Sequence, residues 1–234
     1  QTHKRDVGNG DLFPLSPASD FLQLQNGDVL VSFYYLNGGI VKADNNLHFK
    51  KHYLVLKNRT VNNGSNQVWN LFKDNKGIIW GPNQYNSILK LNLATENMID
   101  EEDSILSGPI IMIKQDSGSF IWMGHWRKGL VKMNVDTKEK SFYTQFLHSD
   151  SNNKKRVESL LLDGDKIWVG TNQNGLQVFD KKKEKFTEAF VVNTKDKTSI
   201  TNNSVKDILE YNKDTLIIAT LMGVNIFDKK LKTF

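Results

Sequence analysis

The chain carries the same short pattern several times, and this repetition restricts its fold more than any other feature. Residues 120–134 read FIWMGHWRKGLVKMN and residues 166–180 read KIWVGTNQNGLQVFD, and the two stretches align without a gap. Both contain Ile-Trp, a Gly two residues after the Trp, and a second Gly that is followed by Leu. Repetition of this kind indicates a fold assembled from equivalent units.

Three weaker copies extend the repeat over most of the chain. They cover residues 28–44, 78–92 and 215–228, and in the last of them Ile217 replaces the Trp and Ala219 the first Gly. The five copies close on Asp or Asn at positions 44, 92, 134, 180 and 228, so the spacings are 48, 42, 46 and 48 residues. A period in the mid-forties is typical of the four-stranded blades of β-propellers.

The local pattern within each copy predicts four short strands. An apolar segment precedes each copy, as in QVWNLF, PIIMI, VESLLL and VKDIL, and a polar turn separates the two. Apolar runs of four to six residues bounded by Asn, Asp and Gly are signals of strands and hairpins. We therefore expect antiparallel A-B-C-D meanders with negligible helix. Trp80, Trp122 and Trp168 are predicted to fill the space between neighbouring blades.

Composition narrows the possible functions further. The chain has no cysteine, which excludes disulfides and thiolate metal sites. Its longest apolar runs are far shorter than the ~20 residues of a membrane-spanning helix. The net charge of +5 comes from lysines spread along the chain, which favours ordinary solubility over a nucleic-acid surface. Because the sequence starts at Gln1, we expect a mature form or a piece of a longer protein.

Catalytic and metal-binding motifs are missing from the sequence. It contains no phosphate-binding loop, no nucleophile elbow, no H-E-x-x-H and no EF-hand spacing. The five histidines do not cluster at ligand spacing, and the acidic run at residues 100–103 is interpreted as a solvated loop. We therefore predict no catalytic residue, no metal and no cofactor.

The repeated motifs resemble a known family. IWVGTNQNGLQVFD, VWNLFKDNKGIIWG and NNSVKDILEYNKDTLIIATLMGVNIFD are similar to the two-component regulator propeller repeat, in which a Val-initiated strand and a D-x-x-G turn precede L-W-[IV]-G-T-x-x-G-L and an aromatic-Asp ending. The resemblance is good over residues 60–234 and loose over 20–60. The best copy matches the pattern at Ile167, Trp168, Val169, Gly170, Thr171, Gly175, Leu176, Phe179 and Asp180.

The resemblance implies an all-β fold, a β-propeller of four-stranded antiparallel blades. About five blades are expected here as part of a seven-bladed ring, with units at residues 20–60, 61–104, 105–152, 153–199 and 200–234. Residues 1–19 would be a linker or the end of a preceding blade. If blades are missing, the blade surfaces at the ends of the chain are expected to be apolar and to associate.

The resemblance also implies a function. Such propellers form the periplasmic sensor of hybrid two-component histidine kinases of the Bacteroidetes type, and they sense oligosaccharides. This chain would then be no enzyme itself. The membrane helix, the kinase and the DNA-binding regulator would lie downstream, the receptor would be a homodimer, and this segment would contact no nucleic acid.

Strand parity places the ligand. In an A-B-C-D meander the B–C and D–A connections emerge on one face, and the B–C loops differ between units on a constant frame. Aromatic rings can stack on a sugar ring, whereas amides and Arg can satisfy its hydroxyls or carboxylates. The positive net charge favours an anionic oligosaccharide. The candidate ligand-binding residues in these loops are Tyr35, Gln84, Tyr85, His125, Trp126, Arg127, Asn172 and Gln173.

Two other classes of function stay open at this point. A propeller lyase would need a His with a nearby Glu and a metal, and only His125 lies on the predicted ligand face. A protein-interaction propeller would need no small ligand at all.

Overall fold

The structure is a computed structural model that describes residues 13–14, 16–34, 38–54, 66–83, 87–106, 108–116, 118–148 and 155–234. Its regular structure in these residues is β-strand, apart from one 3-10 helix of three residues, Ser104–Leu106. The strands form five antiparallel sheets. The predicted fold class, an all-β chain of propeller blades, is thereby confirmed. The chain divides into two compact units, residues 1–110 and 111–234.

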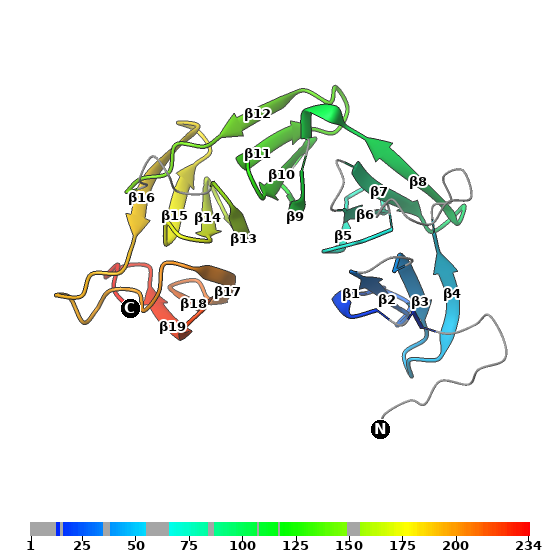
Figure 1. Cartoon of the computed structure of the whole chain (residues 1–234), viewed down its shortest axis with the longest axis horizontal. Helices are drawn as coiled ribbons and strands as arrows, with labels where there is room; N and C mark the ends of the chain where they lie inside the picture. The colour runs from blue at the N-terminus through cyan, green and yellow to red at the C-terminus, as the bar shows by residue number, and fades with distance from the viewer. Residues whose placement is uncertain are drawn as a thin grey trace. The chain divides into compact units, whose positions relative to one another are not determined.

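The first unit contains two sheets whose strands pair in chain order (Figure 1). Blade 1 comprises β1 (Ala18–Gln23), β2 (Val29–Phe33), β3 (Ile40–Ala43) and β4 (Phe49–Tyr53). Blade 2 comprises β5 (Phe72–Lys73), β6 (Ile78–Pro82), β7 (Ser87–Asn92) and β8 (Asn97–Glu102). The first strand therefore begins inside the segment predicted as a linker.

The second unit contains three sheets, and β9 starts at its boundary. Blade 3 comprises β9 (Ile110–Gln115), β10 (Phe120–His125), β11 (Gly129–Asn134) and β12 (Lys140–Tyr143). Blade 4 comprises β13 (Val157–Asp163), β14 (Lys166–Thr171), β15 (Leu176–Asp180) and β16 (Lys185–Phe190). Blade 5 has three strands, β17 (Val205–Asn212), β18 (Thr215–Thr220) and β19 (Gly223–Asp228). In Figure 1, β9, β13 and β17 lie at the inner edges of these three blades.

The repeated glycines have two separate structural roles. Gly129 is the first residue of β11 and Gly175 directly precedes β15, with φ of 75° and 68°, a left-handed conformation that only glycine adopts without strain. Gly124 and Gly170 instead allow close packing, because a Cβ there would lie 2.8 Å from Val157 Cγ1 and 2.7 Å from Val205 Cγ1 of the following blade. The second role explains why Gly follows the Trp in strand B.

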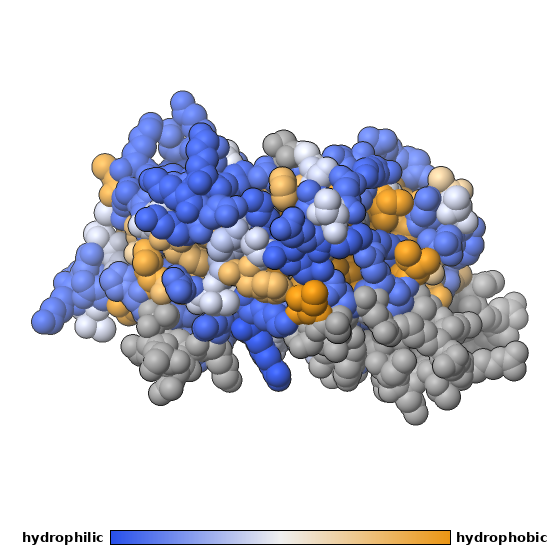
Figure 2. Space-filling view, turned by 90° about the horizontal axis from the view of Figure 1, so that it is seen from above, coloured by the Kyte–Doolittle hydropathy of each residue, from blue (hydrophilic) through white to orange (hydrophobic). Residues whose placement is uncertain are grey.

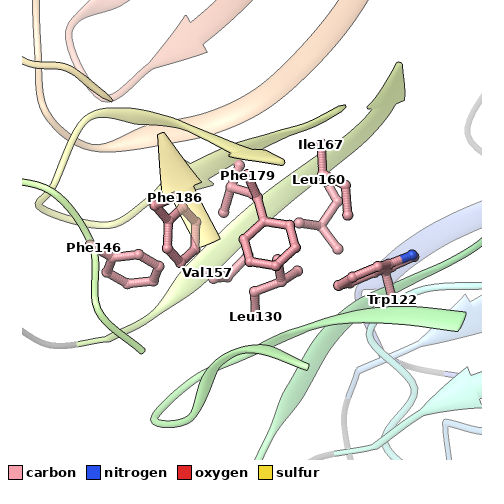
Figure 3. Packing of buried hydrophobic residues seen from close by; sticks show 9 residues of the cluster. Trp122, Leu130, Phe146, Val157, Leu160, Ile167, Phe179 and Phe186 are labelled. Carbon is pink, nitrogen blue, oxygen red and sulfur yellow. The ribbon is translucent and has the colours of Figure 1, made fainter. Parts of the chain in front are cut away.

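Within each unit, hydrophobic cores lie between consecutive blades. Figure 3 shows Phe179 at the centre of the core between blades 3 and 4, with Trp122 on one side and Phe186 on the other. The equivalent core between blades 4 and 5 contains Trp168 and Val205. The exposed fractions of the repeat tryptophans at 80, 122 and 168 are 3%, 1% and 5%, so their predicted core role is confirmed.

Two of these tryptophans are hydrogen-bonded to an aspartate at the end of strand A, where the A–B turn begins. The indole N–H of Trp80 donates to Asp74 at 2.8 Å, and that of Trp168 donates to Asp163 at 2.9 Å. Burial acts to raise the pKa of Asp163, but the hydrogen bonds from Trp168 and Lys229 outweigh it, so this pKa lies below its ordinary value. The turn aspartate therefore also satisfies the indole donor that the core would otherwise leave unpaired.

Blade 5 presents an apolar sheet face to solvent. Leu209, Ile217 and Ile226 are paired across its three strands, and the exposed fractions of Leu209 and Ile226 are 59% and 67%. The equivalent positions of blade 4 include Trp168 and Val178, which blade 5 covers. Figure 2, by contrast, shows a mainly hydrophilic side of the molecule, on which hydrophobic residues form small groups.

We expect Ile226→Lys to reduce self-association of the chain, because contiguous exposed apolar patches associate in water. Since the Ile226 side chain is 67% exposed, the melting temperature should change little. Sedimentation velocity at increasing concentration measures the effect. Phe227→Lys is the matched control, because Phe227 is fully buried and its replacement should unfold the blade. Unchanged association of the Ile226 variant would contradict the expectation.

Candidate functional site

The site is built from the first residue of each B–C loop. Tyr34, Asn172 and Leu221 occupy this position, and each backbone N–H donates to a carbonyl just before strand A of the same blade, at 3.1, 3.1 and 2.9 Å. Trp126 directly follows β10 and holds the same position in blade 3. Backbone hydrogen bonds thus fix where the loops of blades 1, 4 and 5 begin, whatever side chain the residue carries.

The side chain at this position contacts the start of the next blade. The Tyr34 ring lies 4.1 Å from that of Trp69, and the Arg156 guanidinium lies 3.4 Å from the centre of the Trp126 ring. Asn172 Oδ1 accepts hydrogen bonds from Lys206 Nζ and Ser204 Oγ, each at 3.4 Å. A contact from this loop position to the next blade therefore recurs, while its chemistry changes from aromatic pair to cation–π pair to polar pair.

These partner residues flank a valine that opens strand A in blades 4 and 5 and precedes it in blade 2. Arg156 and Glu158 flank Val157, and Ser204 and Lys206 flank Val205. The valine points into the core between blades, with an exposed fraction of 0% at both positions. Because side chains alternate along a strand, its two neighbours point away from that core.

A charged network joins the three blades of the second unit. Arg156 meets the Glu158 carboxylate through two of its nitrogens, with Nε–Oε1 at 2.8 Å and Nη2–Oε2 at 3.0 Å. Lys206 Nζ lies 3.2 Å from Glu158 Oε1. The Glu158 side chain is only 7% exposed, against 19% for Arg156 and 38% for Lys206. Two cations therefore share one buried carboxylate.

His125 stabilises the loop of blade 3 from within. Its exposed fraction is 0%, and its Nδ1 accepts hydrogen bonds from the backbone N–H groups of Arg127 at 2.9 Å and Lys128 at 3.1 Å. Since Nδ1 accepts both bonds, the neutral ring carries its proton on Nε2. The ring therefore shapes the loop from below its surface.

The other predicted residues fall into three groups. Trp126 and Asn172 are half-buried and make the contacts described above, whereas Arg127 and Gln173 are exposed. Tyr35, Gln84 and Tyr85 lie outside the described residues, so their assignment stays a prediction. Within the second unit, the structure brings Trp126 and Asn172 into one chain of contacts through Arg156, Glu158 and Lys206.

The sequence interpretation missed the partners at the start of strand A. It assigned VESLLL and VKDIL to strands and gave no role to the residues beside the first valine. The available signal was their variation: the two residues that flank this valine are Gln and Trp at Val68, Arg and Glu at Val157, and Ser and Lys at Val205. This valine recurs in three blades between changing neighbours, which parallels the pattern of the B–C loops.

Among the residues that the structure describes, no three His, Asp or Glu side chains are placed to hold a metal ion together. In the same part of the chain, no helix has the length and apolar character needed to cross a membrane.

No protein-family model matches the sequence, and comparison with curated proteins gives no match. Solved structures, in contrast, share the fold. The extracellular domain assigned to a hybrid two-component system of B. thetaiotaomicron is 15% identical in sequence to this chain, with a TM-score of 0.75. The match covers 98% of this chain and 31% of that domain. The extracellular domain assigned to a one-component system of the same organism is 19% identical, with a TM-score of 0.65, and the match covers 93% of this chain and 27% of that domain.

An enzyme shares the fold as well. Virginiamycin B lyase from Staphylococcus aureus is 15% identical, with a TM-score of 0.64, over 91% of this chain and 70% of the lyase. The chain spans less than a third of the length of the two B. thetaiotaomicron domains. At these identities the likeness shows the propeller fold, in which the chain resembles extracellular sensor domains of two-component systems.

Proposed function

We propose that this chain is the ligand-sensing propeller segment of an extracytoplasmic sensor of the two-component type, and that it binds an oligosaccharide. The observation that carries the proposal is the recurrent contact between the first B–C loop residue and the start of the next blade. In each pair the loop residue contacts a neighbour of the first valine of the next blade, whereas the chemistry of the contact differs: Tyr34 with Trp69, Trp126 with Arg156, and Asn172 with Lys206. Variation on a fixed frame is typical of a recognition surface.

The chemistry of these pairs suits a sugar. Aromatic rings offer flat apolar surfaces, and amides and ammonium groups offer the donors and acceptors that hydroxyls require. In the second unit, cations outnumber carboxylates in the network around Trp126, which favours an anionic oligosaccharide. The B. thetaiotaomicron proteins are extracellular domains assigned to a hybrid two-component and a one-component system. By analogy with them, we propose that this chain is a periplasmic domain of a homodimeric membrane receptor whose kinase lies in other parts of the protein.

A lyase activity receives less support from the site. The ring of His125 is buried, and its Nδ1 is engaged by two backbone N–H groups, so it offers no exposed base at that atom. The likeness to the lyase rests on fold alone.

Trp126→Ala tests the proposal. We expect it to weaken oligosaccharide binding by roughly 1–3 kcal/mol, the scale of an aromatic contact, while the melting temperature stays nearly unchanged because the ring is half-buried in a loop. Titration calorimetry against neutral and acidic oligosaccharides measures the affinity, and a thermal melt measures the stability.

Phe120→Ala is the matched control, because Phe120 is a 39% exposed aromatic residue at the opposite end of the same strand, β10. It should leave binding unchanged. If the Trp126 variant loses its fold, the residue belongs to the packing between blades. If the unmodified chain binds no oligosaccharide in the panel, the proposed function is wrong.

A further inference from the structure

We infer that Arg156 and Lys206 form an anion-binding subsite in the second unit, which holds a carboxylate or sulfate group of the sugar ligand. The inference rests on the proposed function and adds residues that the loops alone do not contain. Both cations lie on the face that carries Trp126 and Asn172, and both are linked to those residues by direct contacts.

Arg156 is held in place before any ligand arrives. Its guanidinium lies 3.4 Å from the centre of the Trp126 ring, and the Glu158 carboxylate engages its Nε and Nη2. A planar guanidinium fixed by stacking, by an ion pair and by one hydrogen bond from Nη2 loses little conformational freedom on binding. Its remaining N–H donors are thus oriented in advance.

The charge balance of the network favours an anion. Glu158 is the one carboxylate within ion-pair distance of Arg156 or Lys206 among the described residues, so one positive charge is left over. Lys206 keeps 38% of its side chain exposed, and the neighbouring Arg127 and Lys155 are exposed as well. A ligand carboxylate or sulfate could therefore reach the cations without displacing Glu158.

Asn172 is the third residue of the subsite, through its contact with Lys206. Its Oδ1 accepts from Lys206 Nζ at 3.4 Å, the long end of a hydrogen bond. A ligand anion offers the ammonium group a shorter, charge-assisted bond. When the ligand binds, we therefore expect Lys206 to retain its ion pair with Glu158 and to replace its hydrogen bond to Asn172 with a bond to the ligand anion.

A purely structural role makes a different prediction. The network joins blades 3, 4 and 5, so it could serve only to hold them together. In that case Lys206→Met and Glu158→Gln should both lower the melting temperature, and neither should change the preference between acidic and neutral ligands. An anion subsite instead requires the two substitutions to act on binding in opposite directions.

The test uses a glycan array of neutral, uronate-containing and sulfated oligosaccharides, probed with the unmodified chain and its variants. Lys206→Met should weaken binding to acidic glycans about tenfold, the scale of a lost charge-assisted hydrogen bond. Glu158→Gln should strengthen it several-fold, because the ligand anion no longer faces a fixed negative charge. Binding to neutral glycans should not change in either variant.

Lys213→Met is the matched control, since Lys213 is exposed in the A–B turn of blade 5, on the opposite face, and carries the same charge. The uronate and sulfate arms of the array identify which anion is bound. If only neutral glycans bind, or if both variants leave acidic binding unchanged, the inference is wrong and the proposed function stands. If no glycan of any kind binds, both are wrong.

Discussion

Phe179→Ala is expected to lower the free energy of unfolding by about 3–5 kcal/mol, the range for removing a fully buried aromatic ring. Phe179 has an exposed fraction of 0%. Its ring centre lies 5.4 Å from that of Trp122, 4.6 Å from that of Tyr143 and 5.2 Å from that of Phe186. The truncation therefore leaves a cavity between blades 3 and 4, and the surrounding rings are too constrained by the strands to fill it.

Urea unfolding followed by tryptophan fluorescence measures this loss. Phe142→Ala is the matched control, because Phe142 is 37% exposed on β12 and its removal should cost less than about 1 kcal/mol. If the two substitutions had equal effects, the interface between blades 3 and 4 would not be the cooperative core that the packing indicates.

Gly175→Ala is expected to lower the free energy of unfolding by about 3 kcal/mol or more. Gly175 has φ of 68°, and a Cβ there would overlap the carbonyl oxygen of Phe190. The variant must therefore accept a left-handed alanine and also move one backbone segment. Because Gly175 N–H donates to Asn203 O at 3.0 Å, the shift would also disturb the start of blade 5.

Gly164→Ala separates these two contributions. Gly164 also has positive φ, 56°, but a Cβ there meets no atom within 4 Å. In this control the free energy of unfolding should fall only by the ~1–2 kcal/mol that a left-handed conformation costs a non-glycine residue. Thermal melts of the two variants give the difference. Equal losses at the two glycines would show that the overlap with Phe190 is relieved without cost.

The sequence by itself determined the blade. Ile-Trp, the two glycines, the Leu after the second glycine and the closing Asp specify a strand, a turn and a second strand within about 15 residues. These signals are local, because a glycine before strand C or an Asp after it acts on backbone within a few residues of itself. The burial of Trp122 and Trp168 could be predicted for the same reason: a large apolar residue recurring in short strands needs a core.

The tertiary structure alone decided the site. Trp126 lies 30 positions before Arg156, and Asn172 lies 34 positions before Lys206, so no local rule pairs them. They meet because Val157 and Val205 pack against Gly124 and Gly170 of the preceding blade, which sets the distance between blades.

The orientation of His125 was equally hidden from the sequence. It looks like a loop residue on the ligand face, yet its ring turns inward to accept two backbone N–H groups. Strand pattern is encoded by the order of apolar and polar residues. Which side chains meet across blades depends on the packing of whole sheets, and that packing is determined only when the chain folds.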